Sequence, residues 1–487
     1  MNDVEVVVIG SGFAGLGAGV ELKRRGRPSF VILEQAERVG GVWRENTYPG
    51  CACDVRVHLY SFSFCPNPDW SHTYARQPEL LEYLERVATQ FGLRPHLRFG
   101  RRVVEARWHE ALARWQVRCE NGEEWSARFL IAGLGGLSRP SLPALPGLEA
   151  FTGPVFHSAR WDASVELSAA RVGVIGTGAS AIQFVPHLVD RARGVTVFQR
   201  TAPWVLPRGD KAISPALRTV LRVFPFVQTL LRWALYWLHE LRVPAFVKAP
   251  WLMTLASRLA RRHLEAQIAD PAVREQLTPD YALGCKRVLV SDDYYPALTR
   301  PSCELVTSPI EAVVEQGVKT RDGRVHPCDV LIFGTGFEVT DMVGALSISG
   351  RHGVHLGDVW SQGAKAWYGT AVHGFPNLFL LTGPNTGLGH SSMVFMIEAQ
   401  LAFVMKTIDI VTNTDARWWQ VRDDAEAGFN AALQRRLQKT VWLSGCRSWY
   451  LDERGQNVTL WPGFTFTFRA GLSRFDKQLH HLEGVET

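Results

Sequence analysis

The feature that most constrains the fold is a glycine-rich turn between a short strand and a helix near the N-terminus. An apolar, β-branched run over 4–9 leads into residues 10–15, which read GSGFAG. A helical pattern follows over 16–25, and a second apolar strand over 29–33 ends at Glu34. A strand, a glycine turn, a helix and a second strand within about 30 residues predict a βαβ unit that binds a dinucleotide.

The residues of this turn have distinct tasks. Gly10 permits the tight turn, Gly12 lets the backbone approach a pyrophosphate, and Gly15 lets the helix and strand pack closely. The helix N-terminus supplies unpaired N–H groups and the positive end of a dipole. Glu34 stands where a carboxylate accepts hydrogen bonds from a ribose. The competing interpretation is a glycine-rich turn with a purely structural role.

A second unit of the same kind begins at residue 171. A strand over 172–175 leads into a turn that contains Gly176, Gly178 and Ala181, and a helix to about residue 189 follows. No sequence repeat of short period accompanies the two units. They therefore predict two dinucleotide sites in one chain.

The second unit lacks the acid that ends the first. Its second strand, over 195–198, is followed by Gln199, Arg200 and Thr201. A carboxylate repels a 2′-phosphate, whereas a guanidinium pairs with one. We expect FAD at the first site and NADPH at the second, with hydride passing from nicotinamide to flavin. Alternatively, Arg200 is a solvated charge at the end of a strand.

A basic, aromatic segment separates parts of this second unit. The chain of 487 residues has a net charge of +6, and residues 201–275 carry 11 Lys and Arg against 5 Asp and Glu. The pattern there is helical, with Leu230, Trp233, Trp237 and Leu241 on one face and Gln228, Arg232, His239 and Arg242 on the other. Three interpretations stay open, namely a solvated helical face, a cap over the substrate side, and a peripheral membrane contact.

The predicted fold class is α/β, with two Rossmann-like dinucleotide-binding domains and a helical insertion. We expect an FAD domain over 1–145 and 330–487, an NADPH domain over 146–211 and 276–329, and the insertion over 212–275. The sequence shows no signal peptide and no apolar window that would span a membrane, so we expect a cytoplasmic protein that is membrane-associated at most.

The eight cysteines do not form the pattern of a disulfide scaffold. Cys51 and Cys53 are too close for a zinc knuckle, and the other six are scattered. We therefore expect reduced thiols and no metal site. The absence of a Cys-x-x-x-x-Cys pair after the first unit argues against a disulfide reductase.

A longer motif lies between the two units, at Phe151, Gly153, His157, Trp161 and Asp162. It resembles the fingerprint of the type I Baeyer–Villiger monooxygenases, F-x-G-x-x-x-H-x-x-x-W-[PD], at every fixed position. The resemblance continues in Gly41 and Trp43 and in the segments 48–54, 285–287, 293–295, 334–337 and 383–385, and so covers nearly the whole chain.

The resemblance implies a reaction. NADPH reduces FAD, the reduced flavin takes up O2 as a flavin peroxide, and the peroxide attacks a ketone to form an ester or lactone. One oxygen atom enters the product and the other leaves as water. The implied partners are a small-molecule ketone and O2, with no nucleic acid. The abundance of aromatic residues suggests that the ketone is bulky and apolar.

The resemblance also implies residue roles. Arg287 matches the catalytic arginine, and Asp54 matches the carboxylate that holds it. Lys286 matches a residue that grips the 2′-phosphate beside Arg200 and Thr201, while Asn385 joins the cofactor-binding set. His157 and Trp161 match positions that the family ties to domain movement and cofactor positioning. The alternative interpretation of Arg287 and Asp54 is an ordinary ion pair with no role in catalysis.

Two features leave alternatives open. The family's Ala-Thr-Gly at the first crossover reads Gly133-Leu134-Gly135 here, which removes a hydroxyl near the flavin. The same peroxide also oxygenates soft heteroatoms such as sulfur and nitrogen, so S- or N-oxygenation is the nearest rival activity. A rival of another class is a flavin-bearing interaction protein without turnover. The aromatic C-terminal segments 448–450 and 460–464 are expected to form a loop over the flavin.

Overall fold

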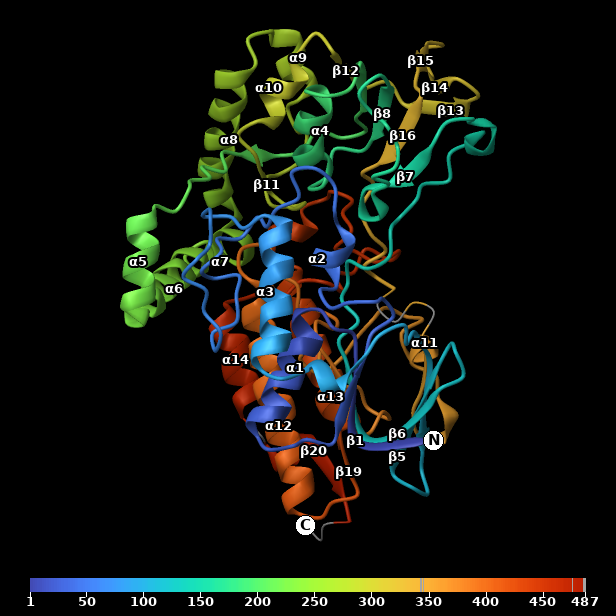
Figure 1. Cartoon of the computed structure of the whole chain (residues 1–487), viewed down its shortest axis with the longest axis vertical. Coiled ribbons are helices and arrows are strands. Elements are labelled where there is room, and N and C mark those ends of the chain that lie inside the picture. The colour runs from blue at the N-terminus through green and yellow to red at the C-terminus, as the bar shows by residue number, and fades with distance from the viewer. Residues whose placement is uncertain (342–343, 345, 475, 485–487) are drawn as a thin grey trace.

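The computed structural model describes residues 1–341, 344, 346–474 and 476–484 and builds them around two main sheets. Figure 1 shows the N-terminal and C-terminal parts of the chain together in the lower half of the molecule. The middle of the chain forms the upper half. The chain therefore passes from the lower unit to the upper one and back again.

The first sheet is built around β1, whose C-terminal half is buried. Its order is β17-β4-β5-β6-β1-β2-β3, and β18 pairs with β6. The strands are β1 (Asn2–Ile9), β2 (Phe30–Leu33), β3 (Leu97–Arg98), β4 (Val103–His109), β5 (Arg114–Cys119), β6 (Glu124–Ala132), β17 (Ser347–Ser349) and β18 (Leu378–Leu380). Residues 6–9 of β1 are buried because the strand is central in the sheet and both faces of the sheet are covered, with Val6 and Val8 in one core and Val7 and Ile9 in another.

Helices from both ends of the chain pack together beside this sheet (Figure 1). They include α1 (Phe13–Arg24), α3 (Gln77–Gln90), α12 (Met393–Asn413) and α14 (Thr465–Ser473). A Cβ atom at Gly17 would lie 2.8 Å from a methyl carbon of Leu401, so the glycine lets α12 approach α1 closely. The remaining elements of this unit are α2 (Val42–Glu45), α11 (Leu356–Val359), α13 (Asp423–Leu437), β19 (Trp418–Val421) and β20 (His480–Glu483).

The second sheet has the order β12-β9-β8-β16-β7, and all of its strands are parallel. They are β7 (Val155–His157), β8 (Arg171–Ile175), β9 (Gly194–Phe198), β12 (Cys303–Val306) and β16 (Val330–Phe333). Around it lie α4 (Ala181–Val189), α10 (Tyr294–Leu298) and a small sheet of β13 (Ile310–Val314), β14 (Gly317–Thr320) and β15 (Val325–Pro327). The α/β class with two Rossmann-like units is confirmed.

One strand lies in a different sheet from the one expected. The boundary at residue 330 assigned β16 to the first domain, but β16 pairs with β8 and β7 of the second sheet. An apolar run that ends in a glycine turn can belong to either sheet, because each unit has such a strand. The chain returns to the first sheet only after the turn over 334–336. This turn lies beside the segment that leaves the first sheet, because Ser141 N donates to Gly336 O.

The expected insertion is helical. It contains α5 (Pro215–Val223), α6 (Pro225–Glu240), α7 (Val243–Val247), the 3-10 turn η4 (Pro250–Leu252), α8 (Met253–Gln267) and α9 (Pro271–Gln276), flanked by the paired strands β10 (Val205–Leu206) and β11 (Leu289–Val290). Figure 1 shows α5 and α6 protruding from the left side of the molecule. Pro225 starts α6 directly after α5 ends. No described helix combines the length and the apolarity needed to cross a bilayer.

The expectation that all thiols are reduced is wrong for two cysteines. Cys285 and Cys446 form a disulfide, with Cα atoms 6.2 Å apart and 161 residues between them in sequence. The two cysteines come together only through tertiary packing, which their spacing in the sequence does not reveal. The bond ties the segment just before Lys286 and Arg287 to the C-terminal part of the chain.

Candidate functional site

The first glycine turn has the geometry that its sequence predicted. Gly10 has a φ of +91°, which permits the tight turn after β1. A Cβ atom at Gly15 would lie 1.8 Å from the carbonyl oxygen of Gly10, so only glycine allows α1 to pack this closely on the strand. Gly12 caps α1 without a side-chain hydrogen bond, and the first N–H groups of the helix stay available for an anion.

Gly41 faces Gly12 across the opening of this turn. It has a φ of +52°, and a Cβ atom built on it would lie 3.0 Å from Gly12 Cα. Two glycine backbones therefore line one narrow space that a side chain at either position would fill. This cradle fits a pyrophosphate, which needs close backbone approach and N–H donors.

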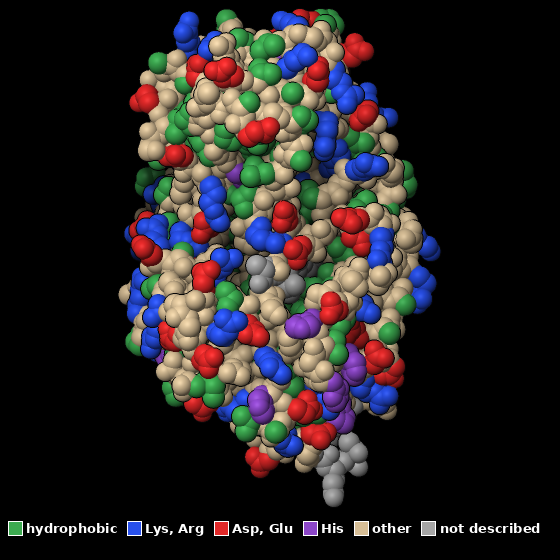
Figure 2. Space-filling view, turned by 90° about the vertical axis from the view of Figure 1, so that its right-hand side faces the viewer, with side chains coloured by type: hydrophobic (Ala, Val, Ile, Leu, Met, Phe, Trp, Pro, Cys, Tyr) green, Lys and Arg blue, Asp and Glu red, His purple; other side chains and the backbone are tan. Residues whose placement is uncertain are grey.

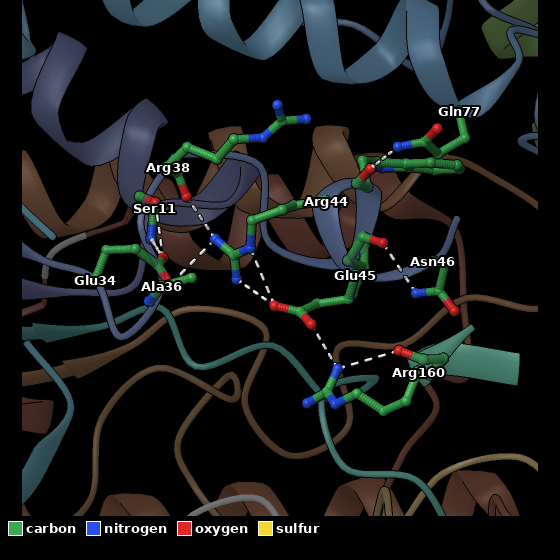
Figure 3. A network of polar contacts seen from close by, with 12 residues as sticks. Ser11, Glu34, Ala36, Arg38, Arg44, Glu45, Asn46, Gln77 and Arg160 are labelled. Atoms are coloured by element: carbon green, nitrogen blue, oxygen red, sulfur yellow. Dashed lines mark hydrogen bonds and ion pairs between the residues drawn. The ribbon is translucent and has the colours of Figure 1, made fainter. Parts of the chain in front are cut away.

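Glu34 is buried at the end of β2 and already carries several hydrogen bonds (Figure 3). Its carboxylate accepts from Ser11 N at 2.9 Å, from Ser11 Oγ at 2.7 Å and from Ala36 N at 3.0 Å, and it lies 3.1 Å from an Nη atom of Arg44. A ribose would replace the rotatable Ser11 hydroxyl while the backbone donors stay in place. The site thus fits a ribose diol, with Ser11 as a competitor that sequence analysis missed.

A chain of ion pairs leads from Glu34 to the fingerprint segment. Arg44 lies between two carboxylates, with Nη2 2.6 Å from Glu45 Oε1, and Arg160 Nη1 lies 2.5 Å from Glu45 Oε2 (Figure 3). Arg160 is three residues after His157 on the segment that links the two units. The first dinucleotide site and the linker are therefore connected by alternating charges.

Trp43 contributes a wall beside the first site. Its Nε1 donates to the Tyr60 hydroxyl at 3.2 Å, and its carbonyl accepts from Gln77. Burial raises the pKa of Tyr60, so the hydroxyl remains protonated and can donate further. Tyr60 belongs to none of the sequence motifs, and sequence analysis missed it.

The second glycine turn repeats the geometry of the first. Gly176 has a φ of +108°, and a Cβ atom on it would lie 2.6 Å from the Gly334 carbonyl oxygen. The helix α4 starts at Ala181 with no side-chain cap, which leaves its N-terminus open beside Gly178. The Thr177 hydroxyl donates to the Thr201 carbonyl at 3.2 Å and ties the turn to the end of β9.

Two cations meet beside this second turn. Partial burial lowers the pKa of Lys286, the positive charge of Arg200 lowers it further, and the Asp280 carboxylate opposes these two effects only in part. Lys286 Nζ also lies 4.6 Å from the centre of the Tyr281 ring. Like charges held together next to an open helix N-terminus favour an anion with more than one negative charge, such as a 2′-phosphate.

Arg287 and Asp54 form an ion pair. Arg287 Nε and Nη2 donate to Asp54 Oδ2 at 2.9 and 2.5 Å. The Asp54 carboxylate raises the pKa of Arg287 despite the opposing effect of burial. Among the described residues, no protein acceptor lies on Arg287 Nη1, so these hydrogens remain for a bound group.

The pair lies where the two units meet. Asp54 follows the segment 48–53, which contacts α4 through bonds between Gln183 Oε1 and both Tyr48 Oη and Ala52 N. Arg287 directly follows Lys286 of the second site. The segment before Asp54 thus contacts α4, the helix that follows the second glycine turn, and Asp54 lies eleven residues after Trp43 of the first site.

Tyr450 lies close enough to Arg287 to feel its charge. Burial raises the pKa of this tyrosine to about 12, and the positive charge of Arg287 partly opposes the rise. This places one aromatic residue of the expected C-terminal loop beside the ion pair. Sequence analysis named the segment but not this contact.

Three fingerprint residues hold the linker in position. Phe151 is buried in the core beside β16, and a Cβ atom at Gly153 would lie 2.1 Å from the Asp329 carbonyl oxygen. His157 Nδ1 accepts from Ala159 N at 3.1 Å. Burial lowers the pKa of His157 to about 4, so its ring is neutral at physiological pH.

The other two fingerprint residues face different surroundings. Trp161 packs edge-on against Phe156, with ring centroids 5.3 Å apart, and also contacts Phe184 of α4. Asp162 is exposed and accepts from Ser164 N at 2.9 Å, which closes a local turn. Both residues shape the linker, and neither contacts the Arg287–Asp54 pair in a hydrogen bond or ion pair of the described structure.

Asn385 is buried in a left-handed conformation, with a φ of +56°. Its Nδ2 donates to the carbonyl oxygens of Asn457 at 2.8 Å and Leu460 at 3.1 Å. The amide donors are therefore used to fix the C-terminal segment, and only the amide oxygen is left for a ligand. At the crossovers, Thr335 Oγ donates to Ser141 O, a bond that Leu134 in the equivalent motif cannot make.

Comparison with known proteins agrees with this arrangement. Residues 7–224 match the family described as pyridine nucleotide-disulphide oxidoreductase. The chain is 46% identical over 98% of its length to a Baeyer–Villiger monooxygenase from Pseudomonas aeruginosa, covering 91% of that protein. It is also 46% identical over 97% of its length to one from Streptomyces coelicolor, again covering 91% of the relative.

Solved structures share the whole fold. A cyclohexanone monooxygenase from Rhodococcus bound to NADP+ superposes with a TM-score of 0.90 at 28% identity, covering 99% of each chain. A steroid monooxygenase bound to NADP gives 0.88 at 32% identity, covering 99% of this chain and all of the other. The two glycine turns, each between a strand and a helix, define an oxidoreductase with two dinucleotide-binding units. Within that class, the chain belongs to the Baeyer–Villiger monooxygenases, which confirms the resemblance and the expected enzyme class.

Proposed function

We propose that the enzyme uses FAD, NADPH and O2 to convert an apolar ketone into an ester or lactone. The observation that carries this proposal is the Arg287–Asp54 ion pair where the two dinucleotide units meet. In the overall balance, ketone, O2, NADPH and a proton become ester, NADP+ and water. FAD, when bound and reduced, supplies the activation of O2.

The first glycine turn would hold FAD through Gly10, Gly12, Gly15 and Gly41, with Glu34 on its ribose. Trp43 would form part of the cavity wall. The second turn would hold NADPH through Gly176, Gly178 and Ala181, with Arg200, Thr201 and Lys286 on the 2′-phosphate. The open N-termini of α1 and α4 and the pair of repelling cations support this assignment.

Arg287 would stabilise negative charge that develops on the reacting oxygen atoms. A guanidinium keeps its charge at every pH at which the protein is folded, and Asp54 fixes its direction through two hydrogen bonds to one oxygen. A fixed charge in a partly buried site needs no reorganisation during the reaction. Asp54 acts here as a positioning residue, and Arg287 as a catalytic residue.

The insertion would cap the substrate side. A Cβ atom at Gly284 would lie 3.2–3.3 Å from side-chain atoms of Met253, Val441 and Phe246. Phe246 belongs to α7 and Met253 to α8, so apolar side chains of the insertion surround the loop that leads to Arg287. This apolar wall supports a hydrophobic ketone as the substrate.

Isotope labelling tests the reaction type. The purified holoenzyme is given NADPH and 18O2 with a cyclic ketone in one sample and an aryl alkyl sulfide in another. We expect one 18O atom in the lactone, and none when the label is supplied as water instead. NADPH consumption without labelled lactone, or labelled sulfoxide as the sole product, would contradict the proposal.

A further inference from the structure

Helix α6 turns its apolar side toward solvent. Phe226, Leu230, Trp233, Trp237 and Leu241 follow one another at spacings of four, three, four and four residues, which places them on one face of the helix and its C-cap. All five are exposed, from 45% for Trp233 to 75% for Leu241. Amphipathic helices of globular proteins normally turn this face inward.

The polar side of α6 is buried and fixed by hydrogen bonds. Gln228 Nε2 donates to Asn67 O at 2.7 Å, and Arg232 Nη1 donates to Ser61 O at 2.8 Å. Glu240 is only 1% exposed and accepts from Thr465 N at 2.9 Å and from Thr465 Oγ at 2.8 Å. The helix cannot roll its apolar face inward without breaking these bonds, so the outward orientation is part of the fold.

Other elements of the insertion also expose apolar side chains. Val220, Val223 and Phe224 at the end of α5 are exposed, and the ring of Trp237 lies 5.9 Å from that of Phe466 on α14. A second apolar stripe on η4 and α8 consists of Trp251, Leu255 and Leu259, which are 69%, 58% and 51% exposed. Both stripes belong to the segment 212–275.

Positive charge predominates over most of this segment, and the exposed acids Glu265, Asp270 and Glu275 lie at its C-terminal end. Residues 211–264 contain nine Lys and Arg and a single acid, Glu240, which is buried. Exposed cations include Lys248, Arg258, Arg261 and Arg262, and also Arg222, which pairs with Asp69. Figure 2, which shows the side of the molecule opposite to α5 and α6, has acidic and basic side chains interspersed. The face opposite to the insertion therefore lacks the predominance of cations found over 211–264.

We propose that the outer surface of α5, α6, η4 and α8 docks on an anionic lipid bilayer. Trp, Phe and Leu would enter the boundary between headgroups and acyl chains, and the cations would meet lipid phosphates. A second copy of the chain fits less well, because two-fold pairing of this face would bring cations against cations. The proposal is independent of the reaction, although it would bring the enzyme to where apolar ketones partition.

Vesicle sedimentation tests the docking. The holoenzyme is mixed with vesicles of pure phosphatidylcholine or of phosphatidylcholine with 30% phosphatidylglycerol at low and high salt. We expect binding to the anionic vesicles at least tenfold stronger than to the neutral ones, weakened by salt, with a blue shift of tryptophan emission. Equal or undetectable binding to both vesicle types would overturn the proposal.

Matched variants locate the contact. Leu230→Ser with Trp237→Ser removes two exposed members of the α6 stripe, and Arg258→Glu with Arg262→Glu reverses charge on α8. We expect each pair to lower affinity for anionic vesicles at least tenfold, while Leu112→Ser, an exposed leucine outside the insertion, leaves it unchanged. Turnover of a small water-soluble ketone should stay at the parental rate in all three, which shows that the fold is intact.

Self-association is measured on the same samples by analytical ultracentrifugation. We expect the variants and the parent to share one oligomeric state in the absence of lipid. If the parent were a dimer that Leu230→Ser with Trp237→Ser made monomeric, and vesicle binding were unchanged, the apolar face would be a protein interface and the lipid proposal would be wrong.

Discussion

A guanidinium is the side chain that best combines a permanent charge with directional hydrogen bonds. At Arg287, burial works against the charged form, and the Asp54 carboxylate more than compensates. The two residues are 233 positions apart, so no local pattern could pair them. The family resemblance named both, whereas Tyr60 stands in no motif, and the proximity of Tyr450 to Arg287 becomes visible only through packing.

Arg200 permits a prediction about coenzyme choice. Because its charge would meet the 2′-phosphate, Arg200→Ala should raise the KM for NADPH by about 10- to 100-fold, the effect of losing one charge-assisted contact of about 1.5–3 kcal/mol. The KM for NADH should change less than about twofold, since NADH lacks that phosphate.

Steady-state kinetics with both coenzymes measures this directly. Arg193→Ala, at a position outside the proposed phosphate site, serves as the matched control. Equal losses for NADPH and NADH would show that Arg200 supports the fold rather than the phosphate.

At the scale of elements, periodicity predicted α6 but not its orientation. The sequence separated Trp233 and Trp237 from Arg232 and His239 onto two faces. In globular proteins the apolar face of an amphipathic helix is normally the buried one. Here the polar face is inside, because its groups find hydrogen-bond partners on other elements. Which face is buried depends on these distant partners, and a single helix pattern does not contain them.

Glu240 permits a prediction about this element. Glu240→Ala leaves the buried Thr465 N without its acceptor, and the Thr465 hydroxyl keeps only Tyr236 Oη, 3.1 Å away, so the free energy of unfolding should fall by about 1–3 kcal/mol. Glu240→Gln keeps an acceptor oxygen and should cost roughly half as much. Thermal unfolding of the three proteins gives the comparison, and an Ala variant as stable as the parent would refute the role of this contact.

At the scale of the molecule, the two strand–turn–helix units were predictable because each is local in sequence. The assignment of β16 and the disulfide between Cys285 and Cys446 were not, because both depend on how distant segments pack. The glycine turns were predictable down to the close approach of Gly15 to Gly10. The sequence showed that the insertion is rich in aromatic and basic residues, but it did not show that the aromatic side chains are exposed.

The buried histidines make stability depend on pH. Burial lowers the pKa of His58, His157, His239 and His480 to about 4. Below about pH 6.5 the unfolded chain binds protons that the folded protein does not, so each group removes stability as the pH falls from 6.5 to 4, by up to about 1.4 kcal/mol per pH unit. Glu426, whose pKa burial raises to about 7, opposes this by one proton.

The Tm should therefore be lower at pH 5 than at pH 7. Differential scanning calorimetry at both values, for the parent and for His58→Gln, measures the effect. The variant has one neutral histidine fewer and should show the smaller decrease. A parent whose Tm is unchanged between the two pH values would contradict the assignment of these side chains as neutral in the folded state.

The most direct test of the account is whether Arg287 serves the oxygen-transfer step separately from coenzyme binding. Stopped-flow absorbance of Arg287→Ala should show flavin bleaching by NADPH within about threefold of the parental rate. Lactone formation should fall by at least about 100-fold, the effect expected when a charge that stabilises the transition state is lost. A variant that forms lactone at the parental rate, or a parent that binds no flavin, would contradict the account.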